Sequence, residues 1–254
     1  MNTQNAEFLK KTLLNLGFGE KLNDELDKKM DGKLPEFQLT TQNEYNGKQV
    51  DYKLHFKAGD NNDMYFFNKY DASVKPENSE ALKQTFYINK GNGVTAKEAF
   101  NLMEGRAVHK QLYSQEGEKY HAWIKLDKEN LTEGGNMKIR SWNDNYGFKP
   151  EEVLVGKGIK EMTTDQGRDN LLRSLKKGNA QQITVERDGK ENKYFISANP
   201  QFKTIDLYDH QMKKIKREEL LKPENSNSKT QKQSTQQKEE LPGKKHNKKR
   251  SQSV

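Results

Sequence analysis

The chain has 254 residues, with 45 Lys and Arg, 37 Asp and Glu, and no cysteine. The lack of cysteine excludes disulfides, thiolate metal sites, iron–sulfur clusters and a cysteine nucleophile, so only histidines and carboxylates remain as metal ligands. No run approaches the roughly 18 apolar residues of a membrane span, and the N-terminus lacks the pattern of a signal peptide. We therefore expect a soluble, cytoplasmic protein without membrane contact.

Charge is divided unevenly along the chain. Residues 211–254 hold 13 Lys and Arg against 5 Asp and Glu, whereas residues 1–210 hold 32 of each. All 23 aromatic residues lie at or before Tyr208, and the last 44 residues include only six apolar ones. Such a segment cannot bury enough apolar surface to offset its ordering entropy. The sequence thus predicts a folded body to about residue 210, a basic helix near 209–221, and disorder beyond Pro223.

Two short amphipathic helices are predicted at the N-terminus, because apolar residues recur at helical spacing over residues 8–16 and 22–30. The clearest strand pair follows. Residues 37–45 and 50–56 alternate around Asn46-Gly47, which is the strongest short-range signal for a hairpin. The runs MYFFNKY and TFYIN predict a third and a fourth strand.

The middle of the chain predicts one helix and a second hairpin. Thr95 and Glu98 have the spacing of a capping box, and Gly105 is expected to end the helix that they open. Residues 108–113 and 120–126 then alternate around the turn SQEGEK. We interpret the Gly/Asn-rich run KENLTEGGN as a separation between two small subdomains.

The rest of the body again mixes strands with single helices. We expect a strand at MKIRSW, a helix that starts at Pro150, a helix from Thr164 to Gly178, and strands at ITV, KYFIS and KTIDLY. Antiparallel strands interrupted by single helices, without a repeated βαβ order, indicate an α+β fold. The predicted units are an N-terminal subdomain (1–126), a C-terminal subdomain (127–210), and a basic helix with a disordered tail (211–254).

The motif search gives no catalytic signature. The sequence contains no GxxxxGK[ST] phosphate loop, HExxH motif, calcium loop, GxSxG elbow or His-hydrophobe-His triplet. His55 is expected at a solvated strand position. His109 and His121 can face each other across the second hairpin, and a nearby carboxylate would complete a metal site. We favour ordinary strand positions for this pair, and expect no metal, no cofactor and no enzymatic activity.

Lysines and aromatic residues interleave in HFKAGDNNDMYFFNKY and TFYINK, a pattern seen in proteins that stack the bases of single strands. The simpler interpretation is that strand alternation turns the rings inward and the lysines outward. We favour it, because the body is neutral and a nucleic-acid-binding surface is usually basic. Only residues 211–254 carry the expected charge, and a merely solubilising tail is the alternative there.

A family resemblance emerges from longer strings, among them NLGFGEKLNDEL, DMYFFNKYDA, EAFNLMEGRAV, GEKYHAWIKLD and ISANPQFKTIDLYD. Over about residues 8–217 the chain resembles a domain-of-unknown-function family of uncharacterised proteins of Bacteroidetes, which are commonly encoded in conjugative and other mobile elements. The resemblance implies an accessory role near genes for DNA transfer or processing. It implies no catalytic residue, because the family has none assigned.

Two functions are compatible with these observations. The first is a non-enzymatic accessory protein of a mobile genetic element that contacts DNA or RNA electrostatically, without sequence preference. The second is a protein–protein interaction module whose neutral body docks a partner encoded by the same element, through GRAVHK and the hairpin after it. The candidate nucleic-acid-binding residues are Lys213, Lys214, Lys216, Arg217, Lys244, Lys245, Lys248, Lys249 and Arg250.

Overall fold

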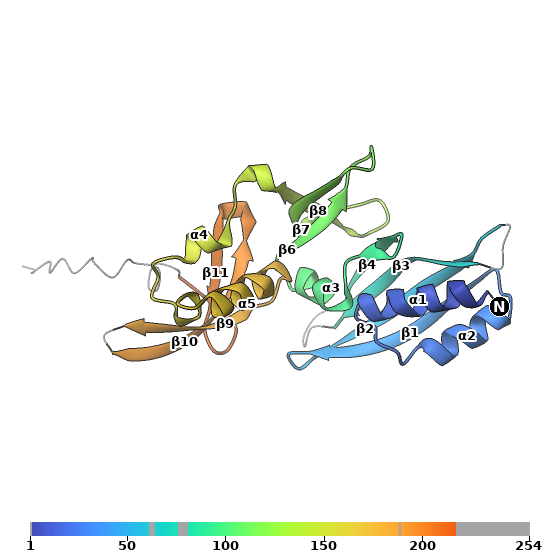
Figure 1. Ribbon diagram of the computed structural model, residues 1–254, viewed down its shortest axis with the longest axis horizontal. Coiled ribbons are helices and arrows are strands. Elements are labelled where there is room, and N and C mark those ends of the chain that lie inside the picture. The colour runs from blue at the N-terminus through green and yellow to red at the C-terminus, as the bar shows by residue number, and fades with distance from the viewer. Residues whose placement is uncertain (1, 61–63, 76–80, 188, 217–254) are drawn as a thin grey trace, which may run out of the picture. The chain divides into compact units, whose positions relative to one another are not determined.

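The computed structural model in Figure 1 describes residues 2–60, 64–75, 81–187 and 189–216. Within these residues the strands form three antiparallel sheets, and helices are interspersed between them, so the predicted α+β class is confirmed. None of the helices in these ranges is long and apolar enough to cross a membrane. The predicted disordered tail lies outside the described residues.

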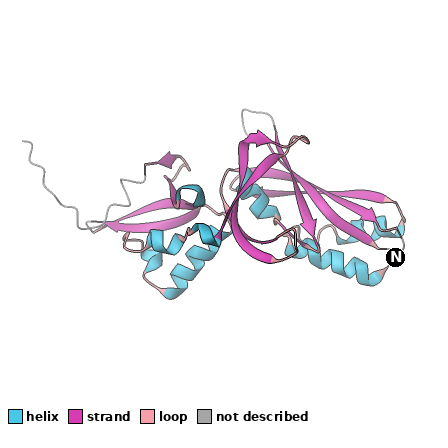
Figure 2. Cartoon of the chain, turned by 90° about the horizontal axis from the view of Figure 1, so that it is seen from above, coloured by secondary structure: helices cyan, strands magenta, loops and turns pink. Residues whose placement is uncertain are grey.

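The N-terminus forms the two predicted helices, α1 (Thr3–Asn15) and α2 (Asn23–Asp31). The Asn2 side chain caps α1 by accepting a hydrogen bond from the Asn5 backbone N–H at 3.0 Å. Gly17 and Gly19, both with positive φ, lie in the connection between the helices. Both helices pack on one face of the first sheet, as Figures 1 and 2 show.

The first sheet has the order β1 (Glu36–Tyr45), β2 (Lys48–Ala58), β3 (Tyr65–Val74), β4 (Leu82–Asn89) and β5 (Asn92–Gly93). Asn46 and Gly47 join β1 to β2 with φ angles of 52° and 74°, the left-handed conformation that a two-residue type I′ turn requires. The predicted hairpin is therefore confirmed. Phe18 fills the space between helices and sheet, with its ring edge-on to those of Tyr52 and Tyr70.

Helix α3 (Ala96–Met103) begins at the predicted capping box, in which Thr95 and Glu98 exchange side-chain-to-backbone hydrogen bonds. The second sheet follows, with the order β6 (Val108–Tyr113), β7 (Lys119–Leu131) and β8 (Met137–Asn143). Strand β7 runs through residues 126 and 127, where the sequence places a boundary. The Gly/Asn-rich loop is instead the hairpin connection between β7 and β8 of one sheet.

The remaining described residues build a second apolar core. Helices α4 (Pro150–Leu154) and α5 (Asp165–Lys176) pack on a sheet with the order β12-β11-β10-β9. Its strands are β9 (Gln181–Arg187), β10 (Lys190–Asn199), β11 (Thr204–Tyr208) and β12 (Lys214–Ile215). Short 3-10 turns lie at Asp144–Tyr146, Lys160–Met162 and Pro200–Phe202.

The basic helix predicted near 209–221 does not form over its described residues. The Asp209 carboxylate accepts hydrogen bonds from the backbone N–H groups of Gln211 and Lys213, each at 2.9 Å, and thereby reverses the chain. β12 then pairs with β11. The physical reason is that the open edge of β11 offers backbone hydrogen bonds, which outweigh the weak helical pattern. Residues 217–221 lie outside the described part.

Candidate functional site

The first sheet has one apolar and one polar face. Along β2 the burial alternates strictly from Val50 to Lys57, with apolar side chains turned toward the helices and most polar ones turned away. We call the polar side the outer face. In the register of the sheet, Thr40, Lys53, Asp71 and Thr85 form one row across β1 to β4. Two residues further along each strand, Gln38, His55, Lys69 and Tyr87 form the next row.

Hydrogen bonds connect all four strands on this face. His55 Nε2 lies 2.7 Å from Asp71 Oδ2, and its Nδ1 lies 3.3 Å from Gln38 Nε2. The Thr85 hydroxyl donates to Asp71 Oδ1 at 2.7 Å. Burial acts to raise the pKa of Asp71, but the hydrogen bonds from Thr85 and His55 outweigh it, so the pKa lies below the ordinary value of a carboxyl group. Asp71 is therefore an ionised anchor at neutral pH.

This network does not have the order of a nucleophile triad. In a Ser-His-Asp triad the hydroxyl donates to the imidazole, and the carboxylate holds the other side of that ring. Here the Thr85 hydroxyl donates directly to Asp71, and His55 lies between Asp71 and Gln38. The arrangement fixes the outer face and places a carboxylate, not an imidazole, next to the Thr85 hydroxyl.

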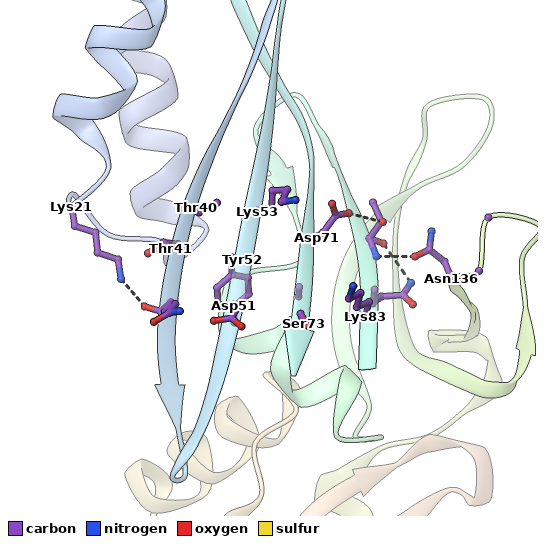
Figure 3. Close-up of a pocket in the computed structure, with 16 residues that line it drawn as sticks. Lys21, Thr40, Thr41, Asp51, Tyr52, Lys53, Asp71, Ser73, Lys83 and Asn136 are labelled. Carbon is purple, nitrogen blue, oxygen red and sulfur yellow. Dashed lines mark hydrogen bonds between the residues drawn. The ribbon is translucent and has the colours of Figure 1, made fainter. Parts of the chain in front are cut away.

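Two hollows lie on the outer face, with volumes of about 820 Å³ and 730 Å³. The larger one extends from Lys21 and Thr40 across Lys53 and Asp71 to Asn136, as Figure 3 shows. The smaller one includes the next row of residues, with His55, Lys69 and Tyr87 in its lining. The two rows are neighbours in the register, so residues that line the two hollows follow one another along the strands.

The β7–β8 hairpin closes one side of the larger hollow. Asn136 Oδ1 accepts a hydrogen bond from the Thr85 backbone N–H at 2.8 Å. The Gln84 side chain accepts from the Met137 backbone N–H at 2.9 Å and donates to the Met137 carbonyl at 3.3 Å. Gly134 and Gly135 of the hairpin also line the hollow. The second sheet therefore fixes a wall of the site from some 50 residues away in the sequence.

Charge at the two hollows is predominantly positive. Among the described residues, the side chains of Lys53, Lys69 and Lys83 make no hydrogen bond or ion pair. Lys21 differs, because its ammonium donates to the Gln42 carbonyl at 2.7 Å. The charged residues lining the hollows are Lys21, Lys29, Lys53, Lys57, Lys69 and Lys83 against Glu36, Asp51 and Asp71.

The aromatic residues of this sheet follow the favoured interpretation with two exceptions. The rings of Tyr52, Phe56 and Tyr70 are buried beneath the helices. Tyr87 is 70% exposed and Phe66 is 47% exposed. Strand alternation in the sequence could have indicated that Tyr87 is exposed, because its neighbours along β4 are buried. The interpretation that turns every ring of the sheet inward misses this residue.

The predicted nucleic-acid-binding residues fall into two groups. Lys213 and Lys216 are exposed at the end of the described chain. Lys214 lies in β12 and forms an ion pair with Asp206 at 2.8 Å. It is therefore held by its own sheet rather than presented on a helix. The other predicted residues lie outside the described part: Arg217, Lys244, Lys245, Lys248, Lys249 and Arg250.

The segment GRAVHK is mostly internal. Arg106 is 7% exposed; its guanidinium donates to the Gly178 carbonyl at 2.9 Å and to Asn101 Oδ1 at 2.7 Å. Ala107 and Val108 are buried beside it. These residues connect α3 and β6 to the end of α5, so they are not exposed for docking; of the surface that the interaction hypothesis names, the hairpin after GRAVHK is exposed at Tyr113 and Tyr120.

His109 and His121 do face each other, with nearly parallel rings whose centroids lie 5.6 Å apart. His109 Nε2 also lies 3.2 Å from Asp144 Oδ1. Burial lowers the pKa of His109, against the opposing effect of Asp144. Within the described ranges, no three His, Asp or Glu side chains are placed to hold a metal ion. The pair is thus a stacked contact beside Trp123.

No protein-family model matches the chain, and neither does any curated protein or solved structure.

Proposed function

We propose that the chain is a non-enzymatic accessory protein of a mobile genetic element that contacts nucleic acid without sequence preference through its basic C-terminal segment. The observation that carries this proposal is the division of charge, with a balance of +8 in residues 211–254 and none in residues 1–210. Cationic segments bind the phosphate backbone by releasing condensed counterions, which requires no base contacts. The family resemblance supplies the mobile-element context.

Ion pairs in the described body support the assignment of nucleic-acid contact to the tail. Some cations of the body are neutralised locally: Lys10 pairs with Asp27, and Lys110 pairs with Glu98. Lys214 also pairs with Asp206, but its side chain is 62% exposed and the pair lies at the surface. The proposed contacts are Lys213, Lys214, Lys216, Arg217, Lys244, Lys245, Lys248, Lys249 and Arg250.

The test is the salt dependence of binding by the full-length chain, measured by fluorescence anisotropy with labelled DNA and RNA. Replacing the five basic residues of 244–250 by Gln should lower the slope of log K against log salt by about 4.5 on duplex and about 3.5 on a single strand, if each contacts one phosphate. The matched control removes five exposed lysines of the body: Lys11, Lys28, Lys119, Lys128 and Lys138. An equal change in both variants would contradict a specific role of the tail.

The interaction-module hypothesis predicts a different outcome. Binding of a protein partner by the neutral body should depend little on salt and should survive the tail substitutions. If neither the wild-type chain nor the variants bind nucleic acid, the proposed function is refuted and the interaction module is favoured.

A further inference from the structure

Two exposed rings on the outer face have no role in the core. Tyr87 is 70% exposed, although Phe86 and Ile88 beside it are buried. Phe66 is 47% exposed on the adjacent strand, opposite the exposed Lys57. Packing of the sheet is already supplied by the buried rings on its other face, so these two rings are free to contact a ligand.

Lysines stand next to these rings. Lys69 is the cross-strand partner of Tyr87, and Lys53 and Lys83 lie in the next two rows. None of the three has a hydrogen-bond or ion-pair partner among the described side chains. Six lysines and three carboxylates line the two hollows together, which favours an anionic ligand.

We propose that the outer face of the first sheet binds single-stranded nucleic acid, with a base stacked on Tyr87 and the sugar–phosphate backbone held by Lys53, Lys69 and Lys83. An exposed ring beside lysines on one face of a sheet is the arrangement that sequence-tolerant single-strand binders use. Inside a duplex the faces of the bases are covered by their neighbours, so the ring can stack on an unpaired base but not on an internal base pair. An acidic peptide would neutralise the lysines but would supply no base to stack on the ring of Tyr87.

This site goes beyond the proposed function of the tail and stands without it. Residues 211–254 contain no aromatic residue, so the tail can supply charge but no stacking platform. Preference for single strands over duplex must therefore arise in the body. The tail, in contrast, should bind both forms with a steep dependence on salt.

The experiment uses the full-length chain with labelled oligothymidylate and a labelled blunt duplex, in fluorescence anisotropy titrations at two salt concentrations. Tyr87→Ala should weaken binding of oligothymidylate about fivefold or more, the effect of losing one stacked base, and should leave duplex binding unchanged. Tyr87→Phe keeps the ring and should bind like wild type. Because Tyr87 is mostly exposed, both variants should keep the melting temperature of wild type within a few degrees.

A second set of variants tests the lysines. Replacing Lys53, Lys69 and Lys83 by Gln should reduce the salt slope on oligothymidylate by about 2, or about 0.7 for each lysine. The control replaces three exposed lysines away from this face, Lys11, Lys28 and Lys119, and should leave the slope close to that of wild type.

Each contrary result has a defined meaning. If the sheet variants bind oligothymidylate like wild type while the tail variant does not, the sheet proposal fails and the tail proposal stands. If the lysine variant alone is impaired, the face holds a polyanion without stacking, which overturns the single-strand site. If polyglutamate displaces labelled oligothymidylate from the variant with Gln at the five basic positions of 244–250 as well as unlabelled oligothymidylate does, at equal charge, an acidic peptide is the ligand of this face instead. Loss of oligothymidylate binding in the sheet variants alone would support the site even if the tail proposal failed.

Discussion

Replacing Gly178 by Ala should destabilise the chain more than the same change at an open glycine. Gly178 follows α5 with a φ of +76°, and its carbonyl accepts the hydrogen bond from Arg106. A Cβ atom at this position would lie 2.7 Å from Cγ2 of Val108 and 2.9 Å from the backbone oxygen of Ala107. Both distances are shorter than van der Waals contact, and the carbonyl cannot rotate away as a flexible side chain would.

The magnitude has two contributions. A side chain in the left-handed conformation costs about 1–2 kcal/mol, and forcing a methyl group into a filled space costs about 1–3 kcal/mol more. Gly178→Ala should therefore lower the free energy of unfolding by about 2–5 kcal/mol. Gly156 is the matched control, because its φ is +71° but no atom lies within 4 Å of the place that an added Cβ would take. Gly156→Ala should show the conformational cost alone, about 1–2 kcal/mol.

The assay is urea denaturation of the full-length variants, followed by tryptophan fluorescence and far-ultraviolet circular dichroism. Trp123 is a suitable probe because it is buried beside Ala107 and Phe148, close to the substitution. Equal losses for Gly178→Ala and Gly156→Ala would refute the reasoning, because they would show that the end of α5 does not press against the start of β6.

Two further predictions concern the first sheet. The folded-state pKa of Asp71 is depressed, so its ionised form stabilises the fold above the ordinary carboxyl pKa. This contribution disappears as the pH falls through the lower folded pKa. On acidification between about pH 5 and pH 2, Asp71→Asn should therefore lose less stability than wild type, and identical pH profiles of the unfolding free energy would contradict this. Phe18 is 2% exposed and contacts the rings of Tyr52 and Tyr70; Phe18→Ala should cost about 3–5 kcal/mol in chemical denaturation, whereas Phe202→Ala, at an exposed ring, should stay within about 0.5 kcal/mol of wild type.

Local chemistry explains which elements the sequence predicts well. The turn at Asn46 and Gly47 needs only two residues that tolerate positive φ, and the capping box at Thr95 and Glu98 needs only a spacing of three. Neither depends on the rest of the chain. Both are therefore visible in the sequence before any tertiary contact is known.

The C-terminal strand shows the opposite case. Lys213 to Arg217 carry the composition of a basic helix, yet Lys214 and Ile215 add a strand to β11. That outcome depends on an open edge formed elsewhere and on the turn held by Asp209. Composition alone cannot reveal either.

The candidate site is intermediate between these cases. Alternation places Lys53 and Tyr87 on the polar side of their strands, but which residues become neighbours depends on register. The register between β2 and β3 shifts between His55 and Phe56. Because of this shift, counting residues from the turn between these two strands does not predict the row that contains Lys69 and Tyr87. The wall formed by Asn136 is a contact across 51 residues of sequence, for which no local signal exists.

The contact of Asn136 with Thr85 also affects whether copies of this chain can associate through the edge of the first sheet. An uncovered sheet edge can template a strand from a second molecule, and many proteins guard such edges with lysine, proline or a bulge. Here a side-chain amide occupies the Thr85 N–H on the β4 edge, and Gln84 ties the hairpin in place behind it. The carboxamide occupies this backbone donor, so a strand from a second molecule cannot use it to pair with β4, while Tyr87 on the outer face stays exposed.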